Sequence, residues 1–384
     1  MSLLRSARFP AVMLLASAAA GLIVANSAAG PGAAELKAVH LGVPGVFELS
    51  AGHWIADALL AVFFFVVAVE LQFELTNGQL NSPRKALQPA IAAAGGVLVP
   101  IIVYVLFAHG TEAAAGWPIP TATDIAFALG VLAVFGRGLP SGLRIFLLAL
   151  AILDDIVGIV FIAVLFTSDV DFAMIVAATV ALAVFAVLSR LLDTRARVPV
   201  AIAMGLVAVA TWYFVYESGI HATIAGVALG LAMFQTPALR VRHVLEPWVN
   251  GLVLPLFAFS SALVVIPAVS PRELSPAFWG ILVALPVGKI IGITAAGWIS
   301  QRVGHKEGDE RLPLGDLIAA GALGGIGFTV SLLLAELAFA GAPGIRDQAT
   351  LGVLLGSTVS LILAGVLVSW RSWHYRHHPV PATA

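Results

Sequence analysis

Two adjacent aspartates, Asp154 and Asp155, lie in the middle of the apolar stretch LAILDDIVGIVF (150–161). An ionisable residue at the centre of a membrane helix costs on the order of 2.5–3.5 kcal/mol, and such residues mark ion or proton pathways. Carboxylate oxygens are hard ligands for small cations, which a bound proton displaces. Because successive residues on a helix point about 100° apart, one aspartate can face a cavity while the other faces a neighbouring helix. The pair therefore predicts a cation site beside a switchable partner.

Asp124 and Lys289 are two further ionisable residues within apolar stretches. Asp124 follows two prolines and two threonines in GWPIPTATDIAFALG, a pattern that disturbs one turn and caps the next helix. We predict a helix interrupted here, with Asp124 at the positive end of its second half. Lys289 lies half-way along its stretch, opposite an aspartate or the negative end of a half-helix, or else it reaches a membrane interface. Three carboxylates against one lysine leave negative charge for a mobile cation or protons, whereas a structural ion pair needs only one carboxylate.

Four glycines crowd the stretch AAGALGGIGFTVSLLL, at positions 321, 324, 325 and 327. Small residues allow close packing of membrane helices, which is one explanation for them. The other explanation is a second interrupted helix. Two interrupted spans in corresponding places of two halves predict an inverted repeat with a site near the membrane midplane.

The composition places the chain among membrane proteins. Of its 384 residues 60% are hydrophobic and only 11% are charged, against about 25% charged in a soluble domain. The formal net charge of −1 gives no reason to expect nucleic-acid binding, and the absence of cysteine excludes disulfides and thiolate metal sites. We predict an all-α polytopic membrane protein whose residues 1–384 form a single transmembrane transporter domain in the lipid bilayer.

Twelve apolar runs are long enough to span a bilayer, which takes about 17–25 helical residues. The first could also be a signal peptide, but its length favours a retained helix. Spans 4 and 11 are the two predicted to be interrupted. The runs cover residues 9–28, 53–75, 87–108, 118–136, 142–167, 172–191, 198–216, 219–234, 248–268, 277–300, 314–340 and 350–370.

Lysine and arginine orient these spans, because cytoplasmic segments carry an excess of both. With twelve spans, sixteen of the 20 basic residues fall in segments on the side of the N-terminus, three on the other side, and Lys289 within a span. Both termini are therefore predicted to be cytoplasmic. The longest external connection, residues 31–50, contains a Gly-Val-Pro-Gly turn signal and forms either a short hairpin or an irregular loop.

Seven stretches, spread along nearly the whole chain, resemble those of the NhaA family of bacterial sodium/proton antiporters and follow one another in the order found in that family. Inverted repeats with crossed, interrupted helices are known for that family. The resemblance therefore implies the same architecture here, but it is not evidence independent of that family. It also implies the bacterial inner (plasma) membrane and commonly a homodimer joined partly by the external hairpin. The stretches are HWIADALLAVFFFVVAVE, PTATDIAFALGVLAVFG, IFLLALAILDDIVGIVFIAVLF, SGIHATIAGV, EPWVNGLVLPLFAFSSA, VGKIIG and GIGFTVSLLLAELAF.

The resemblance assigns roles residue by residue. Na⁺ would bind at Asp154 and Asp155, with Lys289 as the charge partner. The ion- and proton-binding set is Asp154, Asp155, Asp124 and Thr123. The residues implicated in a pH response are Glu70, Glu74 and His221. The structural set is Asp57, Gly324, Gly325 and Gly327.

The chain departs from the family pattern in several places. Gln72 and Phe73 stand between the two glutamates, where basic residues are usual, so the pH regulation is not expected to transfer unchanged. Ile290 replaces a common proline, and Glu336 is an additional acid. His221 is read either as a structural interfacial histidine or as a pH sensor.

The predicted function is a secondary antiporter, not an enzyme, that exchanges intracellular Na⁺ or Li⁺ for external H⁺ without a cofactor. Cation and protons compete for the buried aspartates, and the site reorients only when loaded. The resemblance implies electrogenic exchange and a role in pH and sodium homeostasis. The alternatives are a sodium-coupled solute symporter, a passive cation channel, and an intramembrane aspartyl protease that pairs Asp124 with Asp154.

Overall fold

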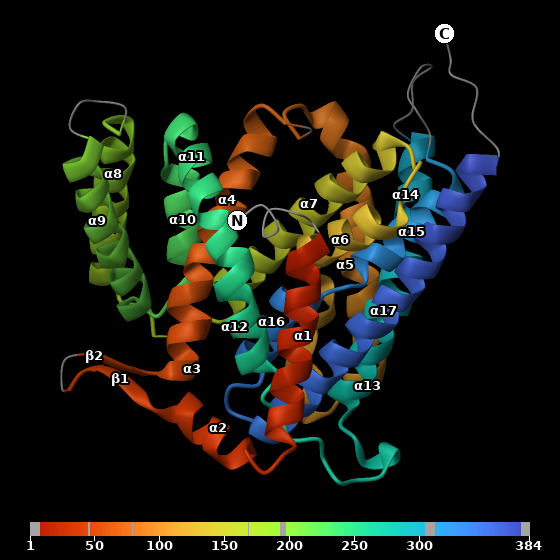
Figure 1. Cartoon of the computed structure of the whole chain (residues 1–384), viewed down its shortest axis with the longest axis horizontal. Helices are drawn as coiled ribbons and strands as arrows, with labels where there is room; N and C mark the ends of the chain where they lie inside the picture. The colour runs from red at the N-terminus through yellow and green to blue at the C-terminus, as the bar shows by residue number, and fades with distance from the viewer. Residues whose placement is uncertain are drawn as a thin grey trace. The chain divides into compact units, whose positions relative to one another are not determined.

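The chain is almost entirely helical (Figure 1). The computed structural model describes residues 8–44, 47–78, 80–167, 169–192, 197–303 and 312–377. In chain order the elements are α1 (Arg8–Ala25), α2 (Gly30–Ala38), β1 (His40–Val43), β2 (Phe47–Ser50), α3 (Ala51–His53), η2 (Trp54–Leu59), α4 (Leu60–Thr76), α5 (Pro83–Ala108), η3 (Glu112–Gly116), η4 (Ile119–Thr121), α6 (Ile125–Phe135), α7 (Ser141–Leu165), α8 (Phe172–Arg190), α9 (Arg197–Glu217), α10 (Thr223–Ala232), α11 (Gln235–Trp248), η5 (Val249–Val253), α12 (Leu254–Ser261), η6 (Pro271–Glu273), α13 (Pro276–Val283), η7 (Ala284–Gly288), α14 (Lys289–Val303), α15 (Leu314–Gly324), α16 (Phe328–Ala338) and α17 (Pro343–His377).

Helices dominate because a backbone in hydrocarbon must satisfy its own hydrogen bonds. Among the described residues, eight helices are long and apolar enough to cross a membrane, and three sharply bent helix pairs raise the number to as many as eleven. The predicted span 219–234 contains α10, which at ten residues is shorter than a span. The all-helical class is confirmed, and the count of twelve spans stays a prediction. Four basic residues used for the orientation lie outside the described residues: Arg5, Arg195, Lys306 and Arg311.

The last helix differs from its prediction. The apolar pattern predicted a span over 350–370, but α17 runs from Pro343 to His377. Its ends carry charged and polar side chains, which hydropathy reads as loop. Pro343 suits the first turn of a helix because its missing N–H has no partner there in any case. Arg371, which lies just outside the predicted span, is therefore a helical residue, and it is buried.

The chain forms two compact units. α1 and α7 each contribute residues to both units. The first unit comprises residues 1–5, 17–81 and 159–263, and the second comprises 6–16, 82–158 and 264–384.

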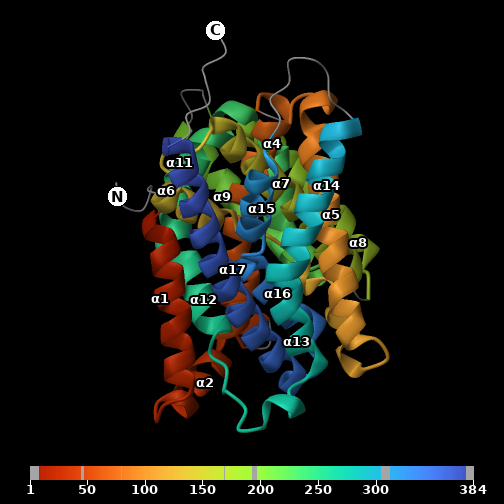
Figure 2. The same cartoon turned by 90° about the vertical axis from the view of Figure 1, so that its right-hand side faces the viewer.

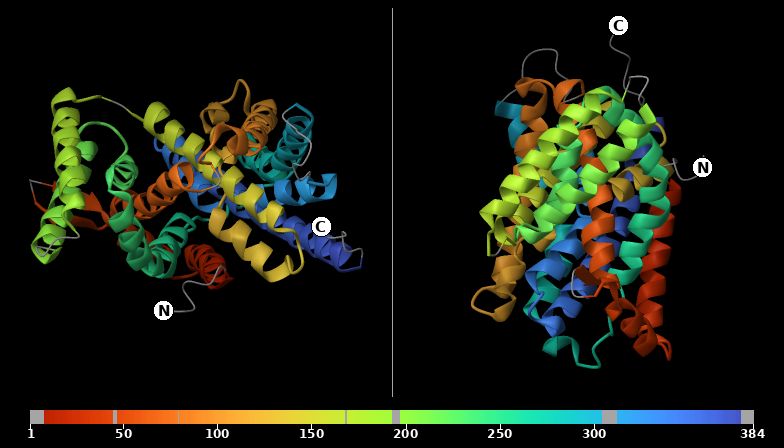
Figure 3. Two further views of the ribbon diagram at one scale, coloured as in Figure 1. Left: turned by 90° about the horizontal axis from the view of Figure 1, so that it is seen from above. Right: turned by 90° about the vertical axis from the view of Figure 1, so that its left-hand side faces the viewer.

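In the first unit, α4 packs closely on α10, and α8 lies beside α9 (Figure 3). Gly226 and Gly230 of α10 leave no room for a Cβ against the backbone oxygens of Ala61 and Phe65. Strands β1 and β2 pair antiparallel, with His40 opposite Ser50. The predicted stretch 31–50 thus holds most of α2 followed by a two-stranded hairpin, whose residues 45 and 46 lie outside the described residues.

In the second unit, α5 and α14 lie side by side and antiparallel (Figure 2). A Cβ on Gly292 would overlap the backbone oxygen of Gly95, and one on Gly288 would lie 2.9 Å from Cα of Pro100. This spacing of small residues four apart is the usual basis of close helix approach in membranes. The close approach holds the first turn of α14, and with it Lys289, against α5.

Gly292→Ala should therefore lower the free energy of unfolding by about 1–3 kcal/mol, the usual cost of overpacking. The measurement is thermal unfolding of the purified protein in detergent. Gly205→Ala in α9 is the matched control, because a Cβ there meets no atom within 4 Å. Equal melting temperatures for Gly292→Ala and the unmodified protein would contradict the packing argument.

Candidate functional site

Two sharply bent helix pairs meet in the second unit. The segment 112–121 and α6 are bent by 47° across residues 122–124, and α15 and α16 by 48° across residues 325–327. The two breaks touch, since the backbone N–H of Asp124 donates to the carbonyl oxygen of Ile326 at 2.6 Å. Breaks of this kind expose backbone N–H and C=O groups that have no partner within their own helix. The side chains around the breaks supply those partners.

Asp124 caps two helices at once. As the N-cap of α6 its Oδ1 accepts from the backbone N–H of Phe127 at 3.1 Å. Its Oδ2 accepts from Thr329 in the first turn of α16, from the hydroxyl at 2.8 Å and the backbone N–H at 3.3 Å. A carboxylate at the N-termini of two helices offsets their partial positive charges. The predicted capping role is thus present in the geometry, and a second helix that the sequence did not indicate shares it.

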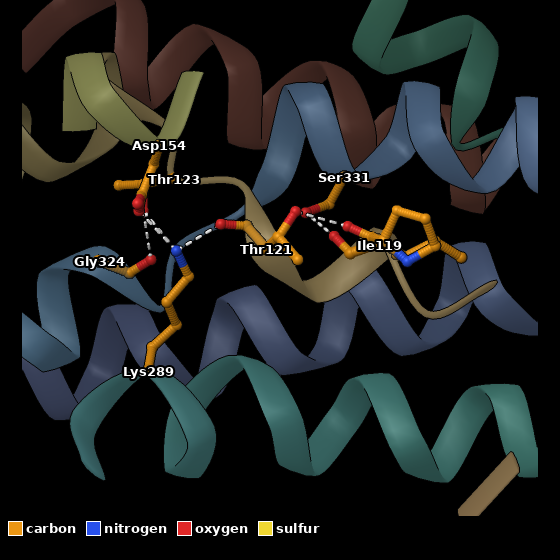
Figure 4. Close-up of polar contacts among 8 residues, drawn as sticks. Ile119, Thr121, Thr123, Asp154, Lys289, Gly324 and Ser331 are labelled. Atoms are coloured by element: carbon orange, nitrogen blue, oxygen red, sulfur yellow. Dashed lines mark hydrogen bonds and ion pairs between the residues drawn. The ribbon is translucent and has the colours of Figure 1, made fainter. Parts of the chain in front are cut away.

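Lys289 forms a fully buried ion pair with Asp154. Its Nζ lies 2.6 Å from Oδ2 of Asp154, and neither side chain is exposed (Figure 4). The same Nζ donates to the carbonyl oxygen of Thr121 at 2.5 Å and to the hydroxyl of Thr123 at 3.1 Å. The ammonium therefore meets both a carboxylate and the carbonyl end of a short helix, η4. A buried charge needs this degree of compensation to be tolerated.

Thr123 joins the two breaks through one hydroxyl. Its Oγ1 lies 2.8 Å from Oδ2 of Asp154 and 2.8 Å from the carbonyl oxygen of Gly324, while it accepts from Lys289 (Figure 4). A hydroxyl carries a single hydrogen, so it donates to one of the two oxygens at a time. Thr123 can therefore exchange partners between α7 and the end of α15 without moving its backbone.

Asp155 lies beside this network, and among the described residues it forms no ion pair with an ammonium group. Asp155 is buried, and its Oδ1 accepts no hydrogen bond within the described residues. Oδ1 of Asp154 likewise accepts no hydrogen bond there. The charges of Asp124 and Asp154 both act on Asp155. Two carboxylate oxygens thus remain for a proton or a cation. Among the described residues no group of three His, Cys, Asp or Glu side chains is arranged to hold a metal ion.

At the second break, three glycines lie where the surrounding atoms leave no room for a Cβ. A Cβ on Gly324 would lie 2.6 Å from Cδ1 of Ile293, one on Gly325 2.6 Å from the backbone oxygen of Leu285, and one on Gly327 2.9 Å from Cδ2 of Leu285. None of the three has a positive φ. The close packing offered as one explanation for the glycine-rich stretch is therefore present, and it surrounds the bend between α15 and α16, while an interrupted span stays a prediction.

The other predicted residues belong to the first unit. Asp57, in the π-helical turn η2, has its Oδ1 3.4 Å from Nε2 of His221, whose Nδ1 lies 2.8 Å from the hydroxyl of Thr223. Glu70 forms an ion pair with Arg242. Glu74 is buried in α4.

Gln72, which lies between Glu70 and Glu74 on α4, has a clear structural role. Its Nε2 donates to the carbonyl oxygens of Leu231 at 2.7 Å and Met233 at 2.9 Å. These are carbonyls at the C-terminal end of α10, which have no partner within the helix. A neutral amide therefore satisfies the carbonyl end of α10.

Sequence reasoning missed several polar groups of the second unit. The hydroxyl of Thr329 and the backbone carbonyl of Thr121 hold the site through contacts between segments far apart in sequence, which spacing alone cannot indicate. Asp316 and Arg371 form a second buried ion pair, at 2.6 Å. Opposite charges at the start of one apolar run and just beyond the end of another were the available signal, but Asp316 was not singled out within the predicted span 314–340 and Arg371 fell outside the predicted span 350–370.

The chain is similar to known antiporters over nearly its whole length. The sequence profile of the family described as Na⁺/H⁺ antiporter 1 matches residues 1–368. The Na⁺/H⁺ antiporter NhaA 2 of Clavibacter michiganensis is 54% identical, with 97% of this chain and 92% of that protein covered. The NhaA antiporter of Tropheryma whipplei (strain Twist) is 47% identical, with 96% and 95% covered, and that of Streptomyces antibioticus is 42% identical, with 97% and 79% covered.

All of these relatives are named as antiporters, which are membrane transporters and not enzymes. The many apolar helices of the fold agree with that class. Since the profile covers most of the chain and the relatives exceed 40% identity over almost all of it, the chain belongs to the NhaA family of bacterial Na⁺/H⁺ antiporters.

Proposed function

We propose that this protein exchanges intracellular Na⁺, or Li⁺, for external H⁺ across the bacterial plasma membrane. The observation that carries the proposal is the buried cluster in which Asp155 lies beside the Lys289–Asp154 pair at the junction of two bent helix pairs. The names of the relatives support the choice of ions. Na⁺ and H⁺ are the substrates, and the mechanism requires no cofactor.

Exchange follows from competition for the same oxygens. Oδ2 of Asp154 is occupied by Lys289 and Thr123, whereas Oδ1 of Asp154 and Oδ1 of Asp155 remain available. A cation bound there neutralises the excess negative charge, and so do protons, but not both together. An empty site would carry unpaired carboxylates through a low-dielectric environment, which is costly. Reorientation with one load or the other therefore couples opposite fluxes.

Two further residues of the site, Asp124 and Thr123, assist the exchange. Asp124 stabilises the N-termini of α6 and α16, and Thr123 can release the oxygen of Gly324 or that of Asp154 as the load changes. The resemblance to the family supports an excess of protons over cations per cycle, hence electrogenic exchange, and a role in pH and sodium homeostasis. Glu70, Glu74 and His221 are proposed for the pH response on the same basis.

We also propose a transmembrane architecture for the chain. The whole chain acts as one transmembrane transporter domain of twelve spans, with both termini cytoplasmic, in a homodimer. The fourth and eleventh spans are interrupted and cross near the midplane, as expected for an inverted repeat. The contact between Asp124 and Ile326 supports a meeting of the two breaks.

The structure weighs against the protease alternative. A pair of catalytic aspartates must share a water and a scissile bond. Both oxygens of Asp124 accept from helix N-termini, and Oδ2 of Asp154 accepts from Lys289. The symporter and channel alternatives are separated by transport assays, since a symporter needs added solute and channel flux does not depend on the proton gradient.

Asp155→Asn should abolish Na⁺-driven proton flux to the level of empty liposomes and leave the melting temperature nearly unchanged. The amide keeps the volume but can neither carry a negative charge nor be protonated in the exchange. The assay is dissipation of a proton gradient by added Na⁺ in proteoliposomes, scanned across pH. Asp171→Asn is the matched control, because Asp171 is an exposed N-cap of α8 and asparagine caps equally well. Sodium-driven flux in purified Asp155→Asn would refute the assignment.

Lys289→Ala should reduce exchange and lower the free energy of unfolding by about 3–5 kcal/mol, the usual cost of leaving one charge of a buried pair alone. The double variant Lys289→Ala/Asp154→Asn should recover part of the stability without recovering exchange. Thermal unfolding and the proteoliposome assay measure the two effects. A single variant that matches the unmodified protein in both would show that the pair is dispensable.

Asp124→Asn should raise the apparent Na⁺ concentration for half-maximal exchange roughly tenfold, equivalent to about 1.4 kcal/mol, while exchange persists. Its amide oxygen still caps one helix, but its amide nitrogen cannot accept from Thr329. Asp124→Ala loses both caps and should bind Na⁺ still more weakly and unfold more easily. Complete inactivity of Asp124→Asn would make Asp124 an obligatory ion carrier, and unchanged Na⁺ affinity in both variants would remove it from the site.

A further inference from the structure

A second buried charge cluster joins α15 to α17. Asp316, in the first turn of α15, is fully buried. Its Oδ1 accepts from Nε of Arg371 at 2.6 Å, and its Oδ2 accepts from the hydroxyl of Tyr375 at 2.6 Å. Both oxygens of one carboxylate are thus held by two residues one turn apart on α17.

The surroundings of this cluster are fitted to the arginine. A Cβ on Gly315 would lie 3.0 Å from Cδ of Arg371, so a larger residue would displace that side chain. The guanidinium carbon lies 4.9 Å from the centre of the Tyr375 ring and 5.6 Å from that of Trp370. Arginine suits such a place because its planar group stacks on rings while its N–H groups bind a carboxylate.

The next residue of α17 reaches the other bent helix pair. The hydroxyl of Ser372 donates to the carbonyl oxygen of Arg137, just beyond the C-terminal end of α6, at 2.5 Å. A Cβ on the neighbouring Gly138 would lie 3.4 Å from Cγ of Arg376. Arg371 and Ser372 therefore hold α15 and the end of α6 from one turn of α17. We name Asp316, Arg371, Ser372 and Tyr375 the α17 clamp.

The clamp and the candidate site lie at opposite ends of the same two half-helices. α6 begins directly after its N-cap Asp124 and ends near Ser372, whereas α15 begins at the clamp and ends at Gly324. Each has 11 residues, which puts the clamp about 16 Å from the site. At the site end the two breaks are joined by the Asp124–Ile326 and Thr123–Gly324 hydrogen bonds.

We propose that the α17 clamp positions the cation site: by fixing the far ends of α6 and α15, it sets how closely Thr123 approaches the carbonyl oxygen of Gly324. This inference rests on the proposed antiport function. Asp316, Arg371, Ser372 and Tyr375 are positioning residues, since they act through the two half-helices. Because α6 and α15 are short, rigid helices, a small shift at the clamp should produce a comparable shift at the breaks.

A role in stability alone would look different. Buried ion pairs are weak contributors to stability compared with apolar replacements of similar volume, but they hold a defined geometry. Asp316→Leu/Arg371→Met should therefore keep the protein folded while it removes the directional contacts. If the clamp only stabilises the fold, this double variant should exchange Na⁺ with unmodified affinity.

The functional test separates apparent affinity from maximal rate in proteoliposomes. Asp316→Asn and the apolar double variant should raise the Na⁺ concentration for half-maximal exchange about tenfold, as loss of outer-shell support does at metal sites, with maximal rates within about twofold. Tyr375→Phe and Ser372→Ala remove one hydrogen bond each and should raise it about threefold. These two small deletions keep the test valid if Asp316→Asn does not fold. Asp347→Asn is the matched control, because Asp347 pairs with Arg346 near the other end of α17 at a partly exposed position.

A structural readout is independent of transport. The chain contains no cysteine, so Val134→Cys and Leu314→Cys place two spin labels on exposed positions of α6 and α15 without background. The distance distribution should be narrow in the otherwise unmodified chain and broader with Asp316→Asn or Ser372→Ala. Unchanged distributions, or unchanged Na⁺ affinity in every clamp variant, would overturn the inference. Absence of Na⁺/H⁺ exchange in the unmodified protein would instead overturn the proposed function, and the label distances would still decide the clamp.

Discussion

The buried pair of Lys289 and Asp154 is the interaction on which the rest of the second unit depends. An ammonium and a carboxylate 2.6 Å apart, with neither side chain exposed, cannot be tolerated unless every remaining donor and acceptor is placed around them. Packing of glycines between α5 and α14 brings Lys289 inward, and the π-helical turn η7 directly before it accommodates Pro286, which has no N–H to donate. The close helix packing and the helix irregularity therefore serve one charge.

The two bent helix pairs extend the same constraint to the backbone. At the breaks, helix N-termini present N–H groups and helix C-termini present carbonyls. Asp124 accepts from the N-termini of α6 and α16, while Lys289 and Thr123 donate to the carbonyls of Thr121 and Gly324. Acid at positive ends and base at negative ends is the arrangement that helix dipoles favour. The breaks and the charged residues thus stabilise each other.

The sequence was most informative where a charge stood in an apolar stretch. Asp124, Asp154, Asp155 and Lys289 could be singled out because their cost in a membrane is large and local. Partners supplied by distant segments could not, since nothing in the spacing of Thr329 or Tyr375 indicates which carboxylate they will meet. Hydropathy also failed at the end of α17, because Arg371 is buried by a partner, Asp316, that lies 55 positions away in the sequence. Short-range patterns predicted helices and caps, whereas long-range hydrogen bonds required the structure.

Most buried carboxylates of the second unit have partners that compensate their charge, and this indicates which carboxylate is left to receive a transported ion. In the second unit Asp154 has Lys289, Asp316 has Arg371 and Tyr375, and Asp124 has two helix N-termini. Among the described residues no ammonium or helix end is hydrogen-bonded to Asp155; the carboxylates of Asp124 and Asp154 act on it with like charge, and Lys289 is engaged by Asp154. Removing charge from a compensated group breaks structure, while neutralising Asp155 relieves repulsion. In the proposed exchange, a proton or a cation is therefore best received at Asp155, and the adjacent Asp154 can contribute its free oxygen without giving up its lysine.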